Sequence, residues 1–367
     1  MDRSQSSLAP TSLEEVLSPA WLNTALEESL PGVEVASTLV TETLKTVATK
    51  VRFNVAYRHA PPGAPPAFCV KGSFDAEGAV RSGGTTEANF YRDLASSLPV
   101  RVPPCFYTGI DATSGHSIIV MEDLVSSGST FLAPLSPYRL DQAEGTLDQM
   151  AQLHASAWGR TKTEKIPWLK PILGNIVSYV SEDLLQQHLE GPRGAVLPKE
   201  IKDAKRLNRA MALLSLWAGE DEICLIHGDV HAGNVFETGD GSMGLVDWQV
   251  VQPLTWALDV AYHLGAVLDT DPREKHEREL LSYYLERLAA NGVNPPSEDK
   301  AWRSYRIGLL YGYYMWAITR MVEQTVILEF TTRLGTAVAA HDSFGLLGAG
   351  NSNDKGARNE RQPTSGW

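Results

Sequence analysis

The residues of this 367-residue chain best suited to chemistry lie in two neighbouring segments, 225–236 and 244–249. In each segment a short apolar run leads into polar residues, and a glycine-rich turn separates the two. This predicts strand, loop, strand, hairpin turn and strand. Asp229 and Asn234 lie five positions apart in the first loop, and Asp247 ends the next strand, thirteen positions beyond Asn234. The pattern therefore predicts that three oxygen-bearing side chains converge.

Two carboxylates and one amide suit a hard cation. Mg²⁺ takes oxygen ligands and combines a few protein carboxylates with substrate phosphates. In phosphoryl transfer, one aspartate accepts the proton of the attacking hydroxyl, while an asparagine and a second aspartate hold the metal. The spacing assigns Asp229 to the first role, and Asn234 and Asp247 to the second. The alternative is an ordinary acidic hairpin with solvated loop residues.

The order His-Gly-Asp-x4-Asn, followed by Asp-Trp-Gln, resembles the catalytic and metal loops of the protein-kinase fold. In detail it looks like the aminoglycoside phosphotransferase and choline-kinase-like branch, including the ecdysteroid-kinase-like proteins. The resemblance implies an α+β, bilobal fold with a small antiparallel-sheet lobe and a larger, mostly helical lobe. It also implies ATP- and Mg²⁺-dependent phosphorylation of a hydroxyl group on a small metabolite, natural product or antibiotic.

Length and composition set the broad class. A chain of 367 residues with 43% hydrophobic and 21% charged residues can bury two cores. A formal charge of −12 argues against nucleic-acid or anionic-membrane partners. The three cysteines show no Cys-x-x-Cys spacing, and no apolar run is long enough to span a bilayer. We therefore expect a cytoplasmic protein with a small-molecule partner; the oligomeric state stays open.

Changes in periodicity and composition suggest four regions. A helical extension, residues 1–32, precedes an N-lobe, 33–123, which the resemblance implies binds nucleotide. A C-lobe, 124–347, follows, and the resemblance implies that it is catalytic and binds the substrate. The polar, aperiodic residues 348–367 are predicted to be disordered.

In the N-lobe, Lys71 ends an apolar strand, 67–71, and Glu87 lies near the start of a predicted helix, 85–95. A strand-end lysine and a helix-surface glutamate are usually just solvated. The family resemblance instead implies that Lys71 anchors the nucleotide phosphates and that Glu87 forms an ion pair with it.

Two further segments bear on nucleotide binding. The predicted loop 43–50 lies where kinase-like proteins cover the phosphates, but it contains no glycine, so phosphate contacts would have to come from threonine hydroxyls and backbone N–H groups. An apolar strand ends at Glu122-Asp123-Leu124 and resembles the hinge that holds adenine. There, Glu122 and Leu124 would act through their main-chain groups.

The C-lobe is predicted to be mainly helical. Asp259 has apolar neighbours, so its carboxylate is expected to need a buried hydrogen-bond partner. The resemblance implies that it braces the backbone of the catalytic loop. His154 is interpreted as a structural histidine. Helices are predicted at residues 140–158, 177–189, 201–217, 272–291 and 299–335, with another beginning at Pro253.

Two alternatives concern activity. A protein kinase is disfavoured because Gly228 replaces the arginine that reads an activation-loop phosphate, and only eleven residues separate Asp247 from the helix containing Asp259. A catalytically silent nucleotide-binding or scaffold protein of the same fold is disfavoured by the intact Asp229, Asn234 and Asp247. The substrate stays undecided between a cationic aminoglycoside-like compound and an apolar or sterol-like alcohol.

Overall fold

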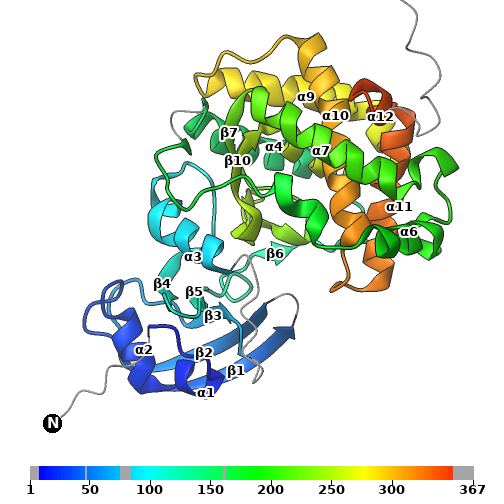
Figure 1. The fold of residues 1–367 in the computed structure, drawn as a ribbon. Coiled ribbons are helices and arrows are strands. Elements are labelled where there is room, and N and C mark those ends of the chain that lie inside the picture. The colour runs from blue at the N-terminus through cyan, green and yellow to red at the C-terminus, as the bar shows by residue number, and fades with distance from the viewer. Residues whose placement is uncertain (1–7, 46–47, 75–83, 160–162, 350–367) are drawn as a thin grey trace, which may run out of the picture.

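The computed structural model describes residues 8–45, 48–74, 84–159 and 163–349, and divides into a smaller sheet-containing part and a larger helical part (Figure 1). This confirms the predicted α+β class. The smaller part holds a five-stranded antiparallel sheet of order β1-β2-β3-β5-β4. Helix α3 (Gly84–Asp93) lies between β3 and β4 in sequence. The strands are β1 (Glu34–Lys45), β2 (Thr49–His59), β3 (Ala67–Gly72), β4 (Cys105–Ile110) and β5 (Ser117–Glu122).

Two short helices before the sheet, α1 (Leu13–Val16) and α2 (Pro19–Leu26), pack into its core. Ser18 accepts a hydrogen bond from Trp21 N–H and so caps α2, as the Ser-Pro signal predicted. The Trp21 ring meets Tyr107 of β4 edge-on at 5.2 Å. These helices are therefore part of the sheet's own hydrophobic core.

The larger part is mostly helical, with two small sheets carrying the segments of chemical interest. One pairs β7 with β10, and the other has the order β6-β8-β9. The strands are β6 (Thr130–Phe131), β7 (Ile223–Ile226), β8 (Val235–Glu237), β9 (Met243–Leu245) and β10 (Gln252–Thr255). The helices are α4 (Leu140–Ser156), α6 (Glu182–Glu190), α7 (Ala204–Glu220), α8 (Trp256–Val267), α9 (Thr270–Ala290), α10 (Glu298–Ile318), α11 (Gln324–Ala340) and α12 (Ser343–Leu346).

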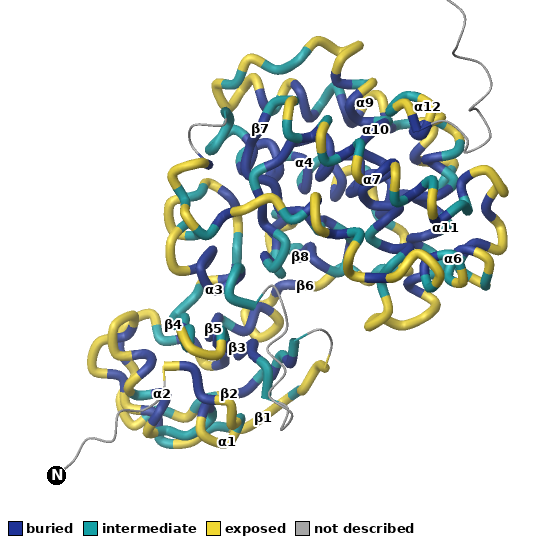
Figure 2. Tube along the Cα trace, in the orientation of Figure 1, coloured by how far each residue is buried: buried dark blue, intermediate teal, exposed yellow. Residues whose placement is uncertain are grey.

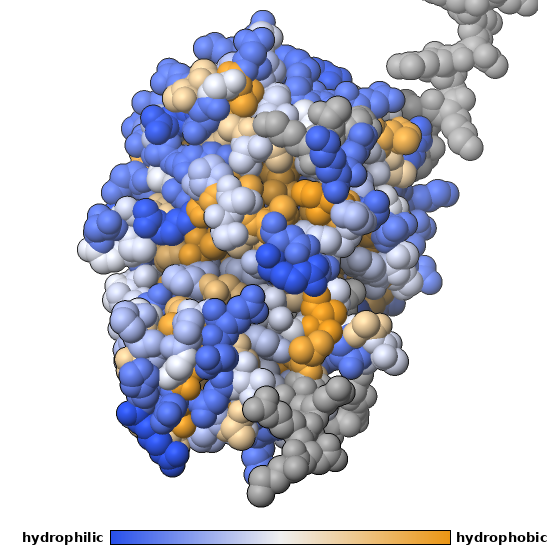
Figure 3. Space-filling model, turned by 90° about the vertical axis from the view of Figure 1, so that its left-hand side faces the viewer, coloured by the Kyte–Doolittle hydropathy of each residue, from blue (hydrophilic) through white to orange (hydrophobic). Residues whose placement is uncertain are grey.

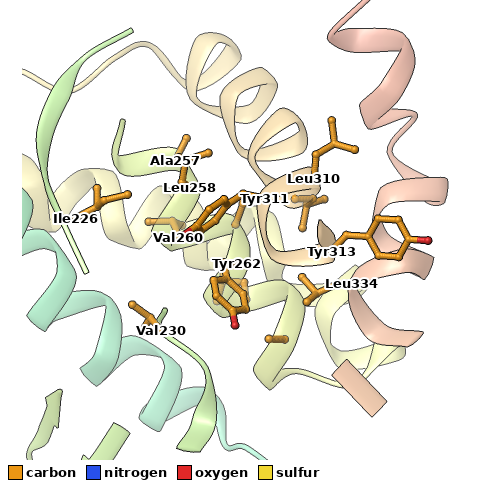
Figure 4. Packing of buried hydrophobic residues seen from close by; sticks show 14 of the residues in the cluster. Ile226, Val230, Ala257, Leu258, Val260, Tyr262, Leu310, Tyr311, Tyr313 and Leu334 are labelled. Carbon is orange, nitrogen blue, oxygen red and sulfur yellow. The ribbon is translucent and has the colours of Figure 1, made fainter. Parts of the chain in front are cut away.

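The core of the larger part is built around α8, every residue of which is buried. Figure 2 shows buried residues, in dark blue, gathered in the interior of this part. Figure 4 shows Leu258 and Val260 of α8 in one cluster with Ile226 of β7 and Tyr311 of α10. The strand that leads into the loop of residues 227–234 is thus anchored in the hydrophobic core of the larger part. No helix in the described ranges is both long and apolar enough to cross a membrane.

Three helix predictions need correction. The segment 299–335 is not one helix but two, α10 and α11. The second helix folds back on the first, so that the ring centroids of Trp316 and Phe330 lie 4.5 Å apart. No glycine or proline marks this break, so the hydrophobic periodicity wrongly predicted one continuous helix. Residues 252–255 form β10 before α8 begins, because they pair with β7. The helix predicted from residue 177 begins only at Glu182, where Ser181 caps it.

Two predicted boundaries also shift. Within the predicted loop 43–50, residues 43–45 and 49–50 are strand, because β1 and β2 pair as far as Lys45 opposite Thr49; Thr43 and Thr49 favour extended backbone. Ala349, placed in the tail, is buried, and its carbonyl accepts a hydrogen bond from Arg206 at 2.9 Å. Residues 350–367 of the predicted tail lie outside the described residues.

Candidate active site

The loop that follows β7 is held by a buried carboxylate of α8. Asp259 accepts hydrogen bonds from the backbone N–H groups of His227 (2.7 Å) and Gly228 (2.8 Å). His154 Nε2 lies 3.2 Å from the same carboxylate. Both predictions, that Asp259 braces this backbone and that His154 is structural, are confirmed. A fully buried carboxylate with three donors fixes the loop firmly.

Gly228 is required by the shape of this loop. Its φ is +84°, and a Cβ built there would lie 2.4 Å from the carbonyl oxygen of Val250. Its own carbonyl accepts a hydrogen bond from the Tyr311 hydroxyl at 2.7 Å. A larger residue is excluded both by backbone conformation and by space.

Asp229 is oriented by two neighbours. The Tyr262 hydroxyl donates to Oδ1 at 2.8 Å, and the Asn234 amide Nδ2 donates to Oδ2 at 3.0 Å. His231 Nε2 lies farther away, 3.8 Å from Oδ2. Each carboxylate oxygen keeps a second lone pair, and the side chain is one-quarter exposed. Asp229 is therefore fixed in direction yet able to accept a proton.

Asp247 lies two residues after the end of β9, and its backbone is in the left-handed region, with φ 69° and ψ 66°. Its Oδ1 lies 2.9 Å from Lys71 Nζ, and its Oδ2 lies 3.0 Å from Lys50 Nζ. Burial opposes ionisation of this carboxyl, but the two ammonium groups outweigh it and hold its pKa well below the usual range. Asp247 is therefore an anion to which two cations are already attracted.

Lys71 and Glu87 form the predicted ion pair, with Nζ and Oε2 2.5 Å apart and both side chains almost fully buried. Burial lowers the pKa of Lys71, but the charges of Asp247 and Glu87 overcome this and raise it above its ordinary value. Burial raises the pKa of Glu87, which shares its one ammonium partner with Asp247. A single buried cation thus connects β3, α3 and the segment after β9.

Aromatic stacking makes the same connection. Trp248, next to Asp247, lies flat against Phe90 of α3, with centroids 3.9 Å apart and an interplanar angle of 8°. His227 Nε2 donates to the carbonyl of Val246 at 3.0 Å, and its Nδ1 accepts from the Asp229 N–H at 3.2 Å. His227 therefore links the segments that carry Asp229 and Asp247.

A cavity of about 430 Å³ lies between the two parts, and Lys50, Lys71 and Asp247 line it. In Figure 3, hydrophobic residues gather near the middle of the face shown, where the lower part meets the upper. The proposed hinge residues Glu122 and Leu124 also line this cavity.

The hinge backbone has unused hydrogen-bonding groups. Glu122 N–H donates to the carbonyl of Pro104 at 2.9 Å, and the return bond is missing because proline has no N–H. The Leu124 N–H has no acceptor within the described part of the chain. One acceptor and one donor, two residues apart, therefore have no hydrogen-bond partner within the described residues.

Sequence reasoning missed several residues of this site. Lys50 was treated only as part of a phosphate loop, although alternation along β2 places it on one face with Arg52. Arg52 bonds both Asp123 of the hinge (2.9 Å) and Glu42 of β1 (2.5 Å). Tyr262, which orients Asp229, was not identified because it is one of many aromatic residues at helical spacing.

The oxygen donors present suit Mg²⁺. Asn234 turns its Nδ2 toward Asp229, and its Oδ1 accepts no hydrogen bond within the described residues. Asp247 is anionic and faces the cavity. In the described ranges no three His, Cys, Asp or Glu side chains group closely enough to hold a metal ion. A metal here would take further ligands from substrate and water, as Mg²⁺ commonly does.

Solved structures share this fold at low sequence identity. The chain is similar to a Plasmodium vivax ethanolamine kinase, with a TM-score of 0.51 and 14% identity over 88% of this chain and 86% of that one. It is also similar to LicA solved in complex with AMP, with a TM-score of 0.51 and 15% identity over 90% and 99%. A Cryptosporidium parvum choline kinase gives a TM-score of 0.50 and 12% identity over 88% and 95%.

No curated protein matches the sequence. The sequence model of one family does match, over residues 88–292, which is more than half of the chain. The matched range includes α3 from Ala88 onward, β4, β5, the loop after β7, Asp247 and the whole of α8. The chain therefore belongs to the ecdysteroid kinase-like family.

Proposed function

We propose that the protein is a small-molecule kinase that transfers the γ-phosphoryl group of ATP, with Mg²⁺, to a hydroxyl group of its substrate. The observation that carries this proposal is the arrangement around Asp247. Lys71, paired with Glu87, contacts Asp247 in the same cavity that the hinge lines. The similar folds of the ethanolamine and choline kinases support the same class of acceptor.

Asp229 is the proposed general base. Tyr262 and Asn234 hold its carboxylate in one orientation, so that a free lone pair can accept the proton of the acceptor hydroxyl as that oxygen attacks phosphorus. The arrangement requires no covalent intermediate on the protein. Positioning and charge neutralisation then supply most of the rate enhancement.

Lys71 is the proposed partner of the nucleotide phosphates, with Glu87 holding its ammonium group in place. Asn234 and Asp247 are the proposed ligands of Mg²⁺, which when bound would neutralise charge on the phosphates and orient them. The main-chain carbonyl of Glu122 and N–H of Leu124 are proposed to bind adenine. LicA, of similar fold, was solved with AMP, which supports an adenine nucleotide in this cavity.

We also propose that the chain is organised as an N-lobe, residues 33–123, that binds nucleotide and a C-lobe, 124–347, that binds the acceptor. A net charge of −12 argues against a nucleic-acid partner. The three cysteines are free thiols, as expected of the cytoplasmic location that we propose.

A two-stage experiment tests this function. Thermal unfolding is measured with MgATP and with ATP plus chelator, and ATP consumption is then followed over a panel of hydroxylated cationic and apolar compounds. The proposal predicts metal-dependent stabilisation by ATP, and ATP consumption with at least one class of hydroxylated compound. Stabilisation without consumption by any compound would favour a silent nucleotide-binding protein, and no stabilisation would contradict the nucleotide site itself.

A further inference from the structure

Lys50 lies opposite another lysine in the sheet, a position where a lysine is not expected. It pairs directly with Lys71 across β2 and β3, and residues directly opposite in an antiparallel pair point to the same face of the sheet. Like charges opposite each other are destabilising. Two lysines therefore share this position only because carboxylates compensate them.

Lys50 belongs to a group of two cations and two anions. Lys71 already has Glu87 and Asp247 as partners, at 2.5 and 2.9 Å. The ammonium of Lys50 adds a second cation, 3.0 Å from Asp247 Oδ2. The two lysines, Glu87 and Asp247 therefore form a group without net charge. Without Lys50 this group would carry one net negative charge, which would attract a divalent cation.

A metal ion on Asp247 would displace Lys50 from that carboxylate. Mg²⁺ binds oxygen at about 2.0–2.1 Å, and two cations would then compete for one carboxylate oxygen. The Lys50 side chain is 27% exposed and lines the cavity. It is therefore free to move toward any anion that arrives with the metal.

Arg52, the next residue on the same face of β2, is not available for this purpose. Its guanidinium bonds both Asp123 and Glu42. Lys50, by contrast, has Asp247 as its one carboxylate partner in the described part of the chain. The segment before Lys50 lacks glycine and so lacks the flexible N–H groups that usually bind phosphate. A mobile ammonium group would replace them.

We propose that Lys50 is a second phosphate-binding residue, which exchanges Asp247 for the nucleotide phosphates when the metal binds. The proposal rests on the proposed kinase function and adds to it a residue that the family resemblance did not identify. Without nucleotide, Lys50 neutralises the charge of Asp247. In the nucleotide complex, it neutralises charge on the phosphates.

Titration calorimetry on the Lys50→Met variant with MgADP and with adenosine tests this exchange. Removing a charge-assisted hydrogen bond should weaken MgADP binding by roughly 10- to 100-fold. Adenosine, which has no phosphate, should bind as it does to wild type. Lys50→Arg should retain most of the MgADP affinity because the charge is kept. Arg58→Met, at the exposed end of the same strand, removes a charge away from the cavity and should bind both ligands normally.

The outcomes separate the possible roles. Wild-type MgADP affinity in Lys50→Met would overturn the proposal while leaving the kinase assignment intact. Equal losses of MgADP and adenosine affinity, with a lower melting temperature, would show a purely structural ion pair and would also overturn it. Wild-type protein that binds neither ligand would overturn this proposal and the nucleotide site together.

Discussion

At the scale of single residues, the proposed chemistry depends on Asp247, a carboxylate in a backbone conformation that aspartate seldom adopts. A left-handed residue other than glycine costs about 1–3 kcal/mol unless its surroundings impose it. Here, the contacts with Lys71 and Lys50 and the stacking of Trp248 on Phe90 impose it. The strain directs the carboxylate toward β3 and the cavity.

Asp247→Asn should abolish the metal dependence of nucleotide binding. Asparagine tolerates the left-handed region, so the backbone is kept while the anionic ligand is lost. We expect ATP to bind with similar affinity with and without Mg²⁺, and turnover to be lost. Titration calorimetry in Mg²⁺ and in chelator measures this. Wild-type MgATP affinity together with wild-type turnover would exclude Asp247 as a metal ligand.

Lys71→Met should lower turnover by at least about 10²-fold, the usual cost of losing one preorganised charge at a reaction centre. It should also reduce the unfolding free energy by about 3 kcal/mol, because Glu87 loses its buried partner. Turnover and denaturant unfolding on the same preparation check both. Glu87→Gln is the matched control for the lost pair. An unchanged rate in Lys71→Met would make Lys71 a structural residue only.

His263 on α8 predicts a pH dependence of stability. Its Nδ1 donates to the Val230 carbonyl at 3.0 Å, next to Asp229, and burial lowers its pKa to about 4. The unfolded side chain titrates near pH 6.5. The folded state therefore binds fewer protons than the unfolded state between these values. This stability is fully present above about pH 6.5 and falls as pH approaches 4, by up to about 3 kcal/mol.

The check is denaturant unfolding at pH 7 and pH 4.5 for wild type and His263→Gln, in which the amide can still donate to Val230 but does not titrate. The difference between the two proteins should shrink as pH falls. A difference that is the same at both pH values would show that His263 does not titrate as described.

Some of these residues follow from the sequence and others do not. The Lys71–Glu87 ion pair was predicted from the family resemblance and is present, whereas its role stays a proposal. Lys50 was missed because its contact with Asp247 spans 197 positions and no local pattern encodes it. Register between β2 and β3 creates that contact, and register is set by pairing along the whole strand.

At the scale of elements, α8 and α10 determine where the loop after β7 lies. Asp259 of α8 accepts two loop N–H groups, and Tyr311 of α10 donates to the carbonyl of Gly228. Hydrogen bonds from two buried helices therefore fix the position of the loop, which does not depend on the loop's own sequence alone.

Asp259→Ala should reduce the unfolding free energy by about 3–5 kcal/mol, because it leaves buried donors without an acceptor. Tyr311→Phe, which removes one hydrogen bond and keeps the ring, should cost only about 1 kcal/mol. Equilibrium unfolding in urea measures both. Equal, small effects of the two substitutions would show that the loop does not depend on α8 for its position.

Element boundaries were predictable where a capping residue or turn marks them, as at Ser18 before α2. They were not where long-range packing decides. The break between α10 and α11 exists because Trp316 and Phe330 meet, and β10 exists because it pairs with β7. Neither partner is visible from local periodicity.

At the scale of the whole molecule, the candidate site is formed only when both parts meet. Lys50 and Lys71 come from the five-stranded sheet and Asp247 from the helical part, and all three line the cavity between the two parts. The order of motifs in the sequence predicted this two-part architecture. It did not predict the acceptor, since aromatic residues around Asp229 suit cationic and apolar compounds alike.

The most direct test of the account separates binding from chemistry at Asp229. MgATP affinity and phosphoryl transfer to an acceptor from the compound panel are measured on wild type and Asp229→Asn. The account predicts nearly unchanged MgATP affinity and transfer slowed by about 10²–10⁴-fold, as expected for a general base. Transfer at the wild-type rate, or the loss of nucleotide binding together with transfer, would contradict it.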